Sequence, residues 1–165
     1  MRVRDSRNLI SREKNCTVRT RSLNLTNQEQ GGIMLKTKCI GGIVGLEDGL
    51  RISIMSRHTK NDGITSDPGI SPKSYDEWWK KLAPDEKELG AYLRNEMTFE
   101  IFEAAYLVKL CYDSKANAAM HRLIKLAREG NVTILCAEPS PEFCHRKILA
   151  SECKRLARDL KVLIE

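Results

Sequence analysis

The sequence predicts an α/β protein with a small, mainly parallel sheet flanked by helices in three layers, preceded by a disordered N-terminal tail. The first observation behind this prediction is the run NVTILCAE at residues 131–138, whose β-branched and apolar residues are typical of a buried strand. The second is the short run KVLIE at residues 161–165, which follows a helical segment. Strand, helix and strand at this spacing predict a βαβ unit with parallel pairing and a right-handed crossover.

Two further strands are predicted closer to the N-terminus. MLKTKCI at residues 34–40 shows alternating apolar residues, and RISIM at residues 51–55 is short and β-branched. A glycine-rich stretch at residues 41–49 connects them. Residues 56–73 follow as a loop with Gly, Pro, Asp and Asn throughout. A loop of that length inside a compact domain is either functional or mobile.

Five helices are predicted from apolar periodicity and from the residue types that open or cap helices. The third should place its aromatic residues on one face, and the fourth keeps helical spacing among its apolar residues. The expected starts are Ser74 (in a capping box with Glu77), Pro84, Thr98, Ser114 and Ser140 with Pro141; Gly130 ends the fourth helix, and the fifth runs to about Asp159.

Residues 1–33 lack helical or alternating periodicity and carry most of the positive charge. Their seven basic and three acidic side chains contribute +4 of the net +6, which leaves +2 for residues 34–165. Such a composition cannot bury enough apolar area to offset the entropy of ordering, so we expect a disordered tail and one α/β domain over residues 34–165. Two alternatives stay open: Met34 is the native start, or the tail is a basic arm for nucleic acid.

The six cysteines are scattered rather than spaced as a disulfide framework, and no signal peptide precedes them. We therefore expect reduced thiols and a cytoplasmic protein. No apolar run approaches the roughly 18 residues of a membrane-spanning helix, so no membrane partner is expected. The near balance of charge over residues 34–165 does not by itself indicate a nucleic-acid-binding domain.

A candidate site follows the strand at residues 131–138. In a parallel sheet, ligands bind beyond the carboxyl ends of the strands, and Cys136 lies at that end of its strand. Cys144 is expected in the first turns of the next helix, with His145 and Arg146 beside it. A helix N-terminus attracts anions and lowers the pKa of a thiol, and Arg146 would add to both effects. The stretch ILCAEPSPEFCHR therefore predicts an anion pocket or a thiolate site.

The strand at residues 51–55 should deliver a second group of residues to the same edge. If the two strands are parallel, Arg57 and His58 converge with the stretch after Cys136. We expect Arg57 and Arg146 to hold an anion. Cys144 would be a thiolate or a close polar contact, and His58 or His145 would move protons.

Structural roles stay open for the same residues. Cys136 in a buried strand is typical of a small core residue, Cys144 can face inward as filler, and Arg57 can be a surface charge. His145 can be solvated or bond to a backbone carbonyl. The spacing disfavours a phosphatase loop, and no C-x-x-C, Walker A or G-x-G-x-x-G motif is present. A thiol-redox or metal site built from Cys136, Cys144 and His145 remains an alternative, although the spacing is weak as a structural zinc motif.

Several stretches of the chain carry a family resemblance: RISIMSRHT, YDEWWKKLAP, FEIFEAAYLVKL, LIKLAREGNVTILCAE and CHRKILASEC. In these stretches, over about residues 35–160, the chain resembles the domain-of-unknown-function 488 family. The resemblance implies a compact α/β domain and no assigned reaction. It places Cys136, Glu138, Cys144, His145 and Arg146 inside the most specific stretch, VTILCAEPSPEFCHRKILA. The N-terminal extension departs from what the family leads us to expect.

The leading hypothesis is a small cytoplasmic α/β protein, and an enzyme if its site is catalytic. Its pocket at the carboxyl edge of the sheet would bind an anionic small molecule, a nucleotide or a phosphate, with Glu138 and Cys136 among the ligand-binding residues. One alternative is a non-catalytic nucleic-acid-binding module that uses the basic tail. The other is the thiol-redox or metal site. The sequence identifies no cofactor and no oligomeric state.

Overall fold

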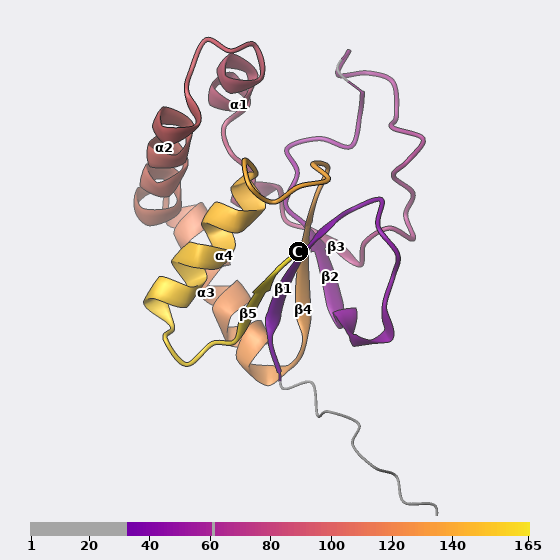
Figure 1. Cartoon of the computed structure of the whole chain (residues 1–165), viewed down its shortest axis with the longest axis vertical. Coiled ribbons are helices and arrows are strands. Elements are labelled where there is room, and N and C mark those ends of the chain that lie inside the picture. Colours follow the sequence, from indigo (N-terminus) through magenta and orange to yellow (C-terminus); the bar gives the residue numbers. More distant parts are fainter. Residues whose placement is uncertain (1–32, 61) are drawn as a thin grey trace, which may run out of the picture. The chain divides into compact units, whose positions relative to one another are not determined.

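The computed structural model of the protein describes residues 33–60 and 62–165. The predictions about the tail fall almost entirely on residues outside this range. The described residues all belong to one unit by their mutual contacts. They hold five strands, four α-helices and two 3-10 helices, coloured along the chain in Figure 1.

In chain order the elements are β1 (Leu35–Cys39), the 3-10 helix η1 (Leu46–Asp48), β2 (Leu50–Ser53), β3 (Glu77–Trp78), the 3-10 helix η2 (Lys80–Leu82), α1 (Glu86–Leu93), α2 (Phe99–Tyr112), α3 (Ser114–Glu129), β4 (Val132–Cys136), α4 (His145–Leu156) and β5 (Val162–Ile164). All four predicted strands are present, each within a few residues of its expected bounds. The predicted α/β class is confirmed.

The strands form one sheet in the order β3-β2-β4-β1-β5, and every neighbouring pair is parallel. β4 is the central strand, since it pairs with β1 on one side and with β2 on the other. Cys39 and Cys136 are register partners at the ends of β1 and β4. The carboxyl ends of these strands therefore meet at one edge, as the βαβ prediction requires.

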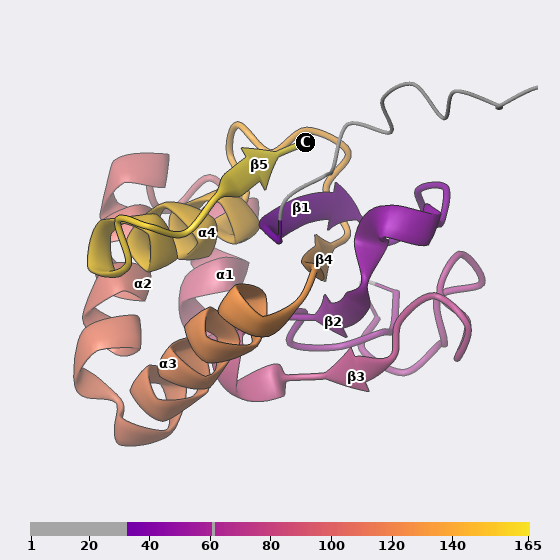
Figure 2. The ribbon, with the colours of Figure 1, turned by 90° about the horizontal axis from the view of Figure 1, so that it is seen from below.

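The direction of each crossover determines which face of the sheet it covers. The connections from β3 to β4 and from β4 to β5 both run toward the β5 edge, so right-handed crossovers place all four α-helices on one face. The connection from β1 to β2 runs the opposite way and places η1 on the other face. Figure 2 shows this arrangement. The layer on the second face thus consists of η1 and loop rather than of α-helix.

The two faces of the sheet differ in chemistry because neighbouring residues of a strand point to opposite faces. Leu35 and Ile134 are buried in the main core on the helical side. On the other side, Thr133 Oγ1 donates a hydrogen bond to the Asp48 carbonyl at 2.7 Å. Lys38 Nζ lies 2.6 Å from the carboxylate of the same buried aspartate. One face therefore supplies the apolar core, and the other binds the η1 segment through polar groups.

Helices α2 and α3 complete the core on the helical side. Phe102 and Tyr106 of α2 and Met120 and Leu123 of α3 are buried together with the sheet residues, as their helical spacing predicts. The predicted cap at Thr98 is also present, because its hydroxyl accepts a hydrogen bond from the third backbone N–H after it. Among the described residues, no helix combines the length and the apolar character that crossing a membrane requires.

The predicted helix that starts at Ser74 is wrong. Glu77 and Trp78 form the edge strand β3, which pairs with β2, and a single 3-10 turn follows. The Ser74 hydroxyl accepts a hydrogen bond from the backbone N–H of Ser71 at 3.0 Å, so it closes a turn instead of capping a helix. Pairing with β2 outweighs the local capping pattern here, because backbone hydrogen bonds to a neighbouring strand satisfy the same groups.

Two of the later helices begin at other residues than expected. Asp113, and not Ser114, caps α3, because its carboxylate accepts hydrogen bonds from the backbone N–H groups of Lys115 and Ala116. Helix α4 begins at His145, and the expected start at Ser140 and Pro141 falls in the preceding loop. Aspartate and serine are comparable as N-cap residues, but the negative charge of Asp113 adds a favourable interaction with the positive helix terminus, which explains the first difference.

Candidate functional site

The candidate site lies where the chain passes from β4 into α4. Cys136 is the last residue of β4, and Cys144 is the N-cap residue of α4. The loop between them lies at the carboxyl edge of the sheet, next to the end of β5, as Figure 1 shows. The Cys144 Sγ accepts a hydrogen bond from the backbone N–H of Arg146 at 3.5 Å, which satisfies one of the free donors at the start of the helix.

Two thiols, a carboxylate and an imidazole meet at this point. One donor atom from each of Cys136, Glu138, Cys144 and His145 lies within 4.8 Å of all the others. The Glu138 Oε2 accepts hydrogen bonds from Cys136 at 2.7 Å and from Cys144 at 3.2 Å. The Cys136 Sγ lies 3.6 Å from His145 Nδ1. The structure therefore brings together four of the residues that the sequence singled out.

Arg146 lies directly behind this cluster and is completely buried. Its guanidinium donates hydrogen bonds to the backbone carbonyls of Glu138, Pro139 and Glu165, and its Nη1 lies 3.6 Å from Cys144 Sγ. These bonds fix the loop after β4 and the end of β5. They also place a permanent positive charge beside the Cys144 sulfur. The Nε of Arg146 is buried and has no hydrogen-bond partner among the described residues.

The two cysteines of the cluster differ in acidity. The pKa of Cys144 is lowered to about 6. The largest cause is a hydrogen bond from Cys136. A hydrogen bond from His145 and the positive charge of His145 act in the same direction, and together these effects outweigh burial, which raises the pKa. Burial, followed by the hydrogen bond and charge of Cys144, raises the pKa of Cys136 well above its usual range. These directions agree with the thiolate expected at Cys144, whose role stays a prediction; the leading cause is a neighbouring thiol and not the helix terminus.

The pKa values of the acid and of the base of the cluster both shift in the direction that favours the charged form. Burial opposes the charge of Glu138, but hydrogen bonds from the two thiols and the charge of His145 outweigh it and lower the pKa of the carboxyl group. Burial alone would lower the pKa of the His145 imidazole. The hydrogen bond and charge of Cys144, together with the charge of Glu138, have the larger effect and raise that pKa. Two negative and two positive groups, including Arg146, thus balance one another in a buried site.

The cluster is surrounded by residues of α2, of the segment after β2 and of the loop before α4. The His145 ring meets the Tyr106 ring of α2 edge-to-face, with centroids 5.7 Å apart. Its Nε2 lies 3.2 Å from the carbonyl oxygen of Ile54, just after β2. The Phe143 ring of the loop meets the Phe99 ring at the start of α2 edge-to-face, with centroids 5.3 Å apart. The sequence placed Phe99 and Tyr106 on one face of a helix, but it did not predict these three contacts, because periodicity does not show which neighbour a ring meets.

Arg57 and His58 lie apart from these contacts. Arg57 is exposed and has no hydrogen bond or ion pair among the described residues. The His58 Nε2 lies 2.8 Å from Ser53 Oγ, and its ring stacks on Trp78 with centroids 4.1 Å apart. Among the described contacts, the segment after β2 therefore reaches the cluster through the carbonyl of Ile54, and not through Arg57 or His58.

A metal ion is one group that the cluster could hold. Thiolate sulfur, imidazole nitrogen and carboxylate oxygen are all zinc ligands, and bond lengths of about 2.0–2.3 Å require donor atoms to lie close together. The four donor atoms meet that requirement after small side-chain movements. The hydrogen bond between His145 and the Ile54 carbonyl is the kind of support that orients a metal-binding histidine.

The fold and the site together define a class of protein: a parallel α/β domain with a thiol, imidazole and carboxylate cluster at the carboxyl edge of its sheet. A family model described as "Active DUF488-N3 subclade" matches residues 35–155, and the chain belongs to this family, DUF488-N3a. The family resemblance predicted from the sequence is confirmed. No curated protein and no solved structure matches the chain.

Proposed function

We propose that the protein is an enzyme that uses the Cys144 thiolate as a nucleophile on an anionic substrate. One observation supports this most: two donors of Arg146, the backbone N–H at 3.5 Å and the guanidinium Nη1 at 3.6 Å, face the Cys144 sulfur. Donors fixed in this way stabilise a thiolate, and the thiolate is the reactive form of cysteine.

The neighbouring residues have separate roles in this proposal. His145 bears the proton that Cys144 has lost, and it is placed to give that proton to a leaving group. The charge of Glu138 favours the protonated imidazole. The single thiol hydrogen of Cys136, which points to Glu138 in the structure, would turn to Cys144 once that sulfur is a thiolate. Arg146 is a positioning residue, because most of its hydrogen bonds go to backbone carbonyls. His58, which the sequence suggested as a second proton carrier, stays a candidate.

The substrate would reach Cys144 from the side of the loop at residues 137–143. The cysteine itself is only 1 % exposed, whereas Phe143 is 57 % exposed. Displacing the Phe143 ring from Phe99 would open this side. The exposed guanidinium of Arg57 makes no ion pair among the described residues, although its charge adds to the hydrogen bonds that lower the pKa of the nearby Asp62 carboxyl group, so it stays a candidate for binding the anionic part of a substrate. All five described cysteines are free thiols, which fits a reducing compartment such as the cytoplasm.

Alkylation of the native protein tests the proposal. Iodoacetamide should modify Cys144, as found by peptide mapping, and inorganic phosphate should slow the reaction by occupying the anion site. Arg57→Ala should remove the protection by phosphate, and Arg158→Ala, which changes an exposed arginine beyond α4, should retain it. If Cys144 stays unmodified until the protein is denatured, the nucleophile proposal fails. Protection that is unchanged in Arg57→Ala would exclude Arg57 from the site.

A metal centre is the second candidate, because the same four donor atoms lie within 4.8 Å of one another. Two thiolates and one carboxylate carry three negative charges, which a divalent ion and the adjacent Arg146 guanidinium would balance. Since all four ligands come from the protein, such a site would be of the closed, structural type. The ion would stabilise the junction between β4 and α4.

Metal analysis separates the two candidates. Protein expressed with zinc in the medium and purified without chelators should contain no stoichiometric metal if Cys144 is a free nucleophile. One ion per chain, lost in Cys136→Ser and retained in Cys153→Ser, would establish the metal centre in its place. Cys153 is a suitable control because it is a buried cysteine outside the cluster. A disulfide between Cys136 and Cys144 in the purified protein would indicate the redox alternative.

A further inference from the structure

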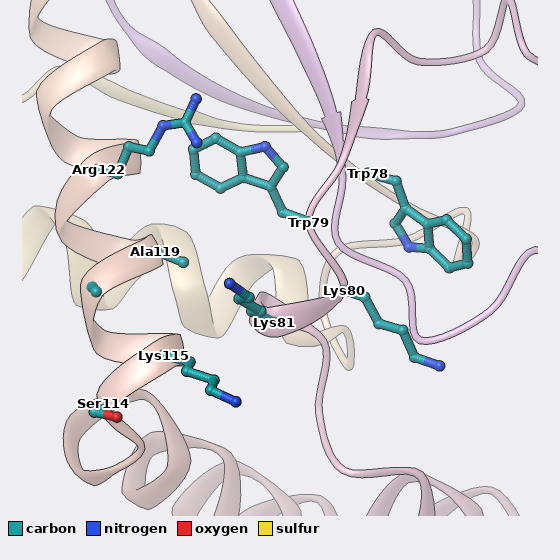
Figure 3. Close-up of a pocket in the computed structure, with 9 residues that line it drawn as sticks. Trp78, Trp79, Lys80, Lys81, Ser114, Lys115, Ala119 and Arg122 are labelled. Atoms are coloured by element: carbon teal, nitrogen blue, oxygen red, sulfur yellow. The ribbon is translucent and has the colours of Figure 1, made fainter.

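We infer that the protein has a second ligand site, separate from the thiol cluster, which binds a nucleotide: a flat ring that carries phosphate. The site is a pocket of about 570 Å³ between the η2 turn and the first half of α3. Figure 3 shows it, with Lys81 on one side and Lys115 on the other. Its volume lies in the range of about 300–1,000 Å³ that is typical of small-molecule sites. The lining residues are Trp78, Trp79, Lys80, Lys81, Ser114, Lys115, Ala118, Ala119 and Arg122.

The charge of the pocket points to an anion. Four of its nine lining residues are cationic, and none is acidic. Lys80 pairs with Glu86 at 3.3 Å, and both side chains are exposed. Within the part of the chain that the structure describes, neither Lys81 nor Lys115 has an ion-pair partner. Two unpaired ammonium groups on opposite walls suit a ligand with more than one anionic oxygen, which is a property of phosphate.

The aromatic wall of the pocket is fixed before any ligand binds. The Arg122 guanidinium carbon lies 4.7 Å from the centre of the Trp79 ring. The Trp79 Nε1 donates a hydrogen bond to Glu77 Oε2 at 2.6 Å, and the same carboxylate oxygen lies 3.9 Å from Arg122. These contacts orient an indole and a guanidinium plane toward the pocket. Both groups stack on flat rings, so a nucleobase is the ring that suits the wall.

The start of α3 does not supply the anion contacts through its backbone. The N–H groups of Lys115 and Ala116 are already bonded to the Asp113 carboxylate at 2.8 and 2.9 Å. The side chains must therefore hold the phosphate. The small side chains of Ala118 and Ala119 leave the space above the helix open, and this space accommodates the ring. Since the pocket shares no residue with the thiol cluster, its test is independent of the proposed reaction.

Tryptophan fluorescence is a specific probe, because the two tryptophans of the chain are Trp78 and Trp79 and both line the pocket. The full chain should be titrated with AMP, ATP, adenosine and inorganic phosphate. Saturable quenching is expected with AMP and ATP. Adenosine lacks the phosphate and inorganic phosphate lacks the ring, so each should bind at least about tenfold more weakly than the nucleotides.

Matched variants place the site. Lys115→Ala and Lys81→Ala should each weaken ATP binding by about tenfold, the effect of losing one charge-assisted hydrogen bond. Lys125→Ala, which changes an exposed lysine of the same helix outside the pocket, should bind ATP normally. Ala118→Leu should block the ring while keeping every charge, and Ala104→Leu on the exposed surface of α2 is its control.

The proposal is overturned if neither nucleotide quenches the fluorescence saturably, or if both pocket lysines can be removed without weakening ATP binding. It is also overturned if a single-stranded oligonucleotide binds at the pocket far more tightly than ATP, since the site would then be a surface for nucleic acid. Circular dichroism of each variant establishes that a loss of binding does not come from unfolding.

Discussion

His145 Nε2 lies 3.2 Å from the carbonyl oxygen of Ile54, and this contact joins the first residue of α4 to the chain that leaves β2. A carbonyl oxygen only accepts hydrogen bonds, so Nε2 must carry a hydrogen. The other ring nitrogen, Nδ1, is then the one that gains or loses a proton. The Cys136 sulfur lies about equally near both nitrogens, 3.6 Å from Nδ1 and 3.5 Å from Nε2. One backbone carbonyl thus determines which nitrogen of the imidazole takes part in proton exchange with the thiols.

The acidity of Cys144 depends on its neighbour Cys136. Because the pKa of Cys144 is about 6, its rate of alkylation should rise with pH to a half-maximum near pH 6 and level off before pH 8. In Cys136→Ala the half-maximum should move to higher pH, because the hydrogen bond that lowers the pKa most is lost. The measurement is the rate of iodoacetamide modification from pH 4 to pH 10, followed by peptide mapping.

The exposed Cys111 is the internal reference for this experiment, because the reagent reaches it and it lies outside the cluster. Cys136 itself should remain unmodified over the whole range, since burial raises its pKa well above the usual value. A Cys144 profile that coincides with that of Cys111, or that does not change in Cys136→Ala, would show that the cluster does not control the acidity of Cys144.

Arg146 should contribute strongly to stability. Arg146→Met keeps the volume of the buried side chain but removes its bonds to the carbonyls of Glu138, Pro139 and Glu165. Several hydrogen bonds from a charged donor are lost together, so we expect the free energy of unfolding to fall by about 3 kcal/mol. Urea denaturation measures it. Arg158→Ala, an exposed control, should change it by less than about 0.5 kcal/mol; equal effects would refute the role of Arg146.

His58 should titrate at lower pH than an ordinary histidine, because burial between Trp78 and Tyr75 lowers its pKa below 6.5. The unfolded chain then binds a proton that the folded chain does not, so stability should fall as the pH drops from about 6.5 toward the folded pKa. The ring signals in NMR spectra, assigned with His58→Gln, measure the midpoint. Trp78→Ala should return it toward 6.5, and a midpoint at or above 6.5 in the unmodified protein would contradict the prediction.

Deletion of residues 1–33 tests the predictions about the tail. We expect the free energy of unfolding to stay within about 1 kcal/mol, since few apolar side chains in this segment can join a core. A loss of several kcal/mol would show that the segment packs on the domain. The basic-arm alternative makes a separate prediction: salt-sensitive binding of DNA or RNA by the full chain, which disappears on deletion.

The sequence was sufficient to predict four of the five strands because each of these four carries its own local signal. Val132 to Cys136 form an uninterrupted apolar and β-branched run, and a strand buried on both faces requires such a run. The candidate site was predicted for a related reason, since Cys136 and Cys144 flank one short loop between a strand and a helix. In a parallel sheet that position alone places a residue at the ligand-binding edge.

The features that were not predicted depend on contacts distant in sequence. β3 has two residues, and only pairing with β2 shows that Glu77 belongs to a strand and not to a helix. Helix α4 starts at His145 because the Arg146 side chain fixes the preceding loop. That side chain donates hydrogen bonds to carbonyls of the loop and to the carbonyl of Glu165 at the end of the chain. Neither the strand pairing nor the hydrogen bonds of Arg146 produce a repeat or a characteristic spacing in the sequence, so local sequence patterns could not predict them.

The position of β4 between β1 and β2 has a consequence for biosynthesis. β1 and β2 follow each other in the chain but do not pair, and Leu35 finds its partner only in Val132. At synthesis rates of about 5–20 residues per second, the ribosome takes roughly 5–20 s to add the intervening segment. During that time both strands have unpaired backbone edges, which other chains can bind. The nascent protein should therefore depend on chaperones until the central strand has emerged, whereas α2 and α3, whose contacts are local, can form earlier.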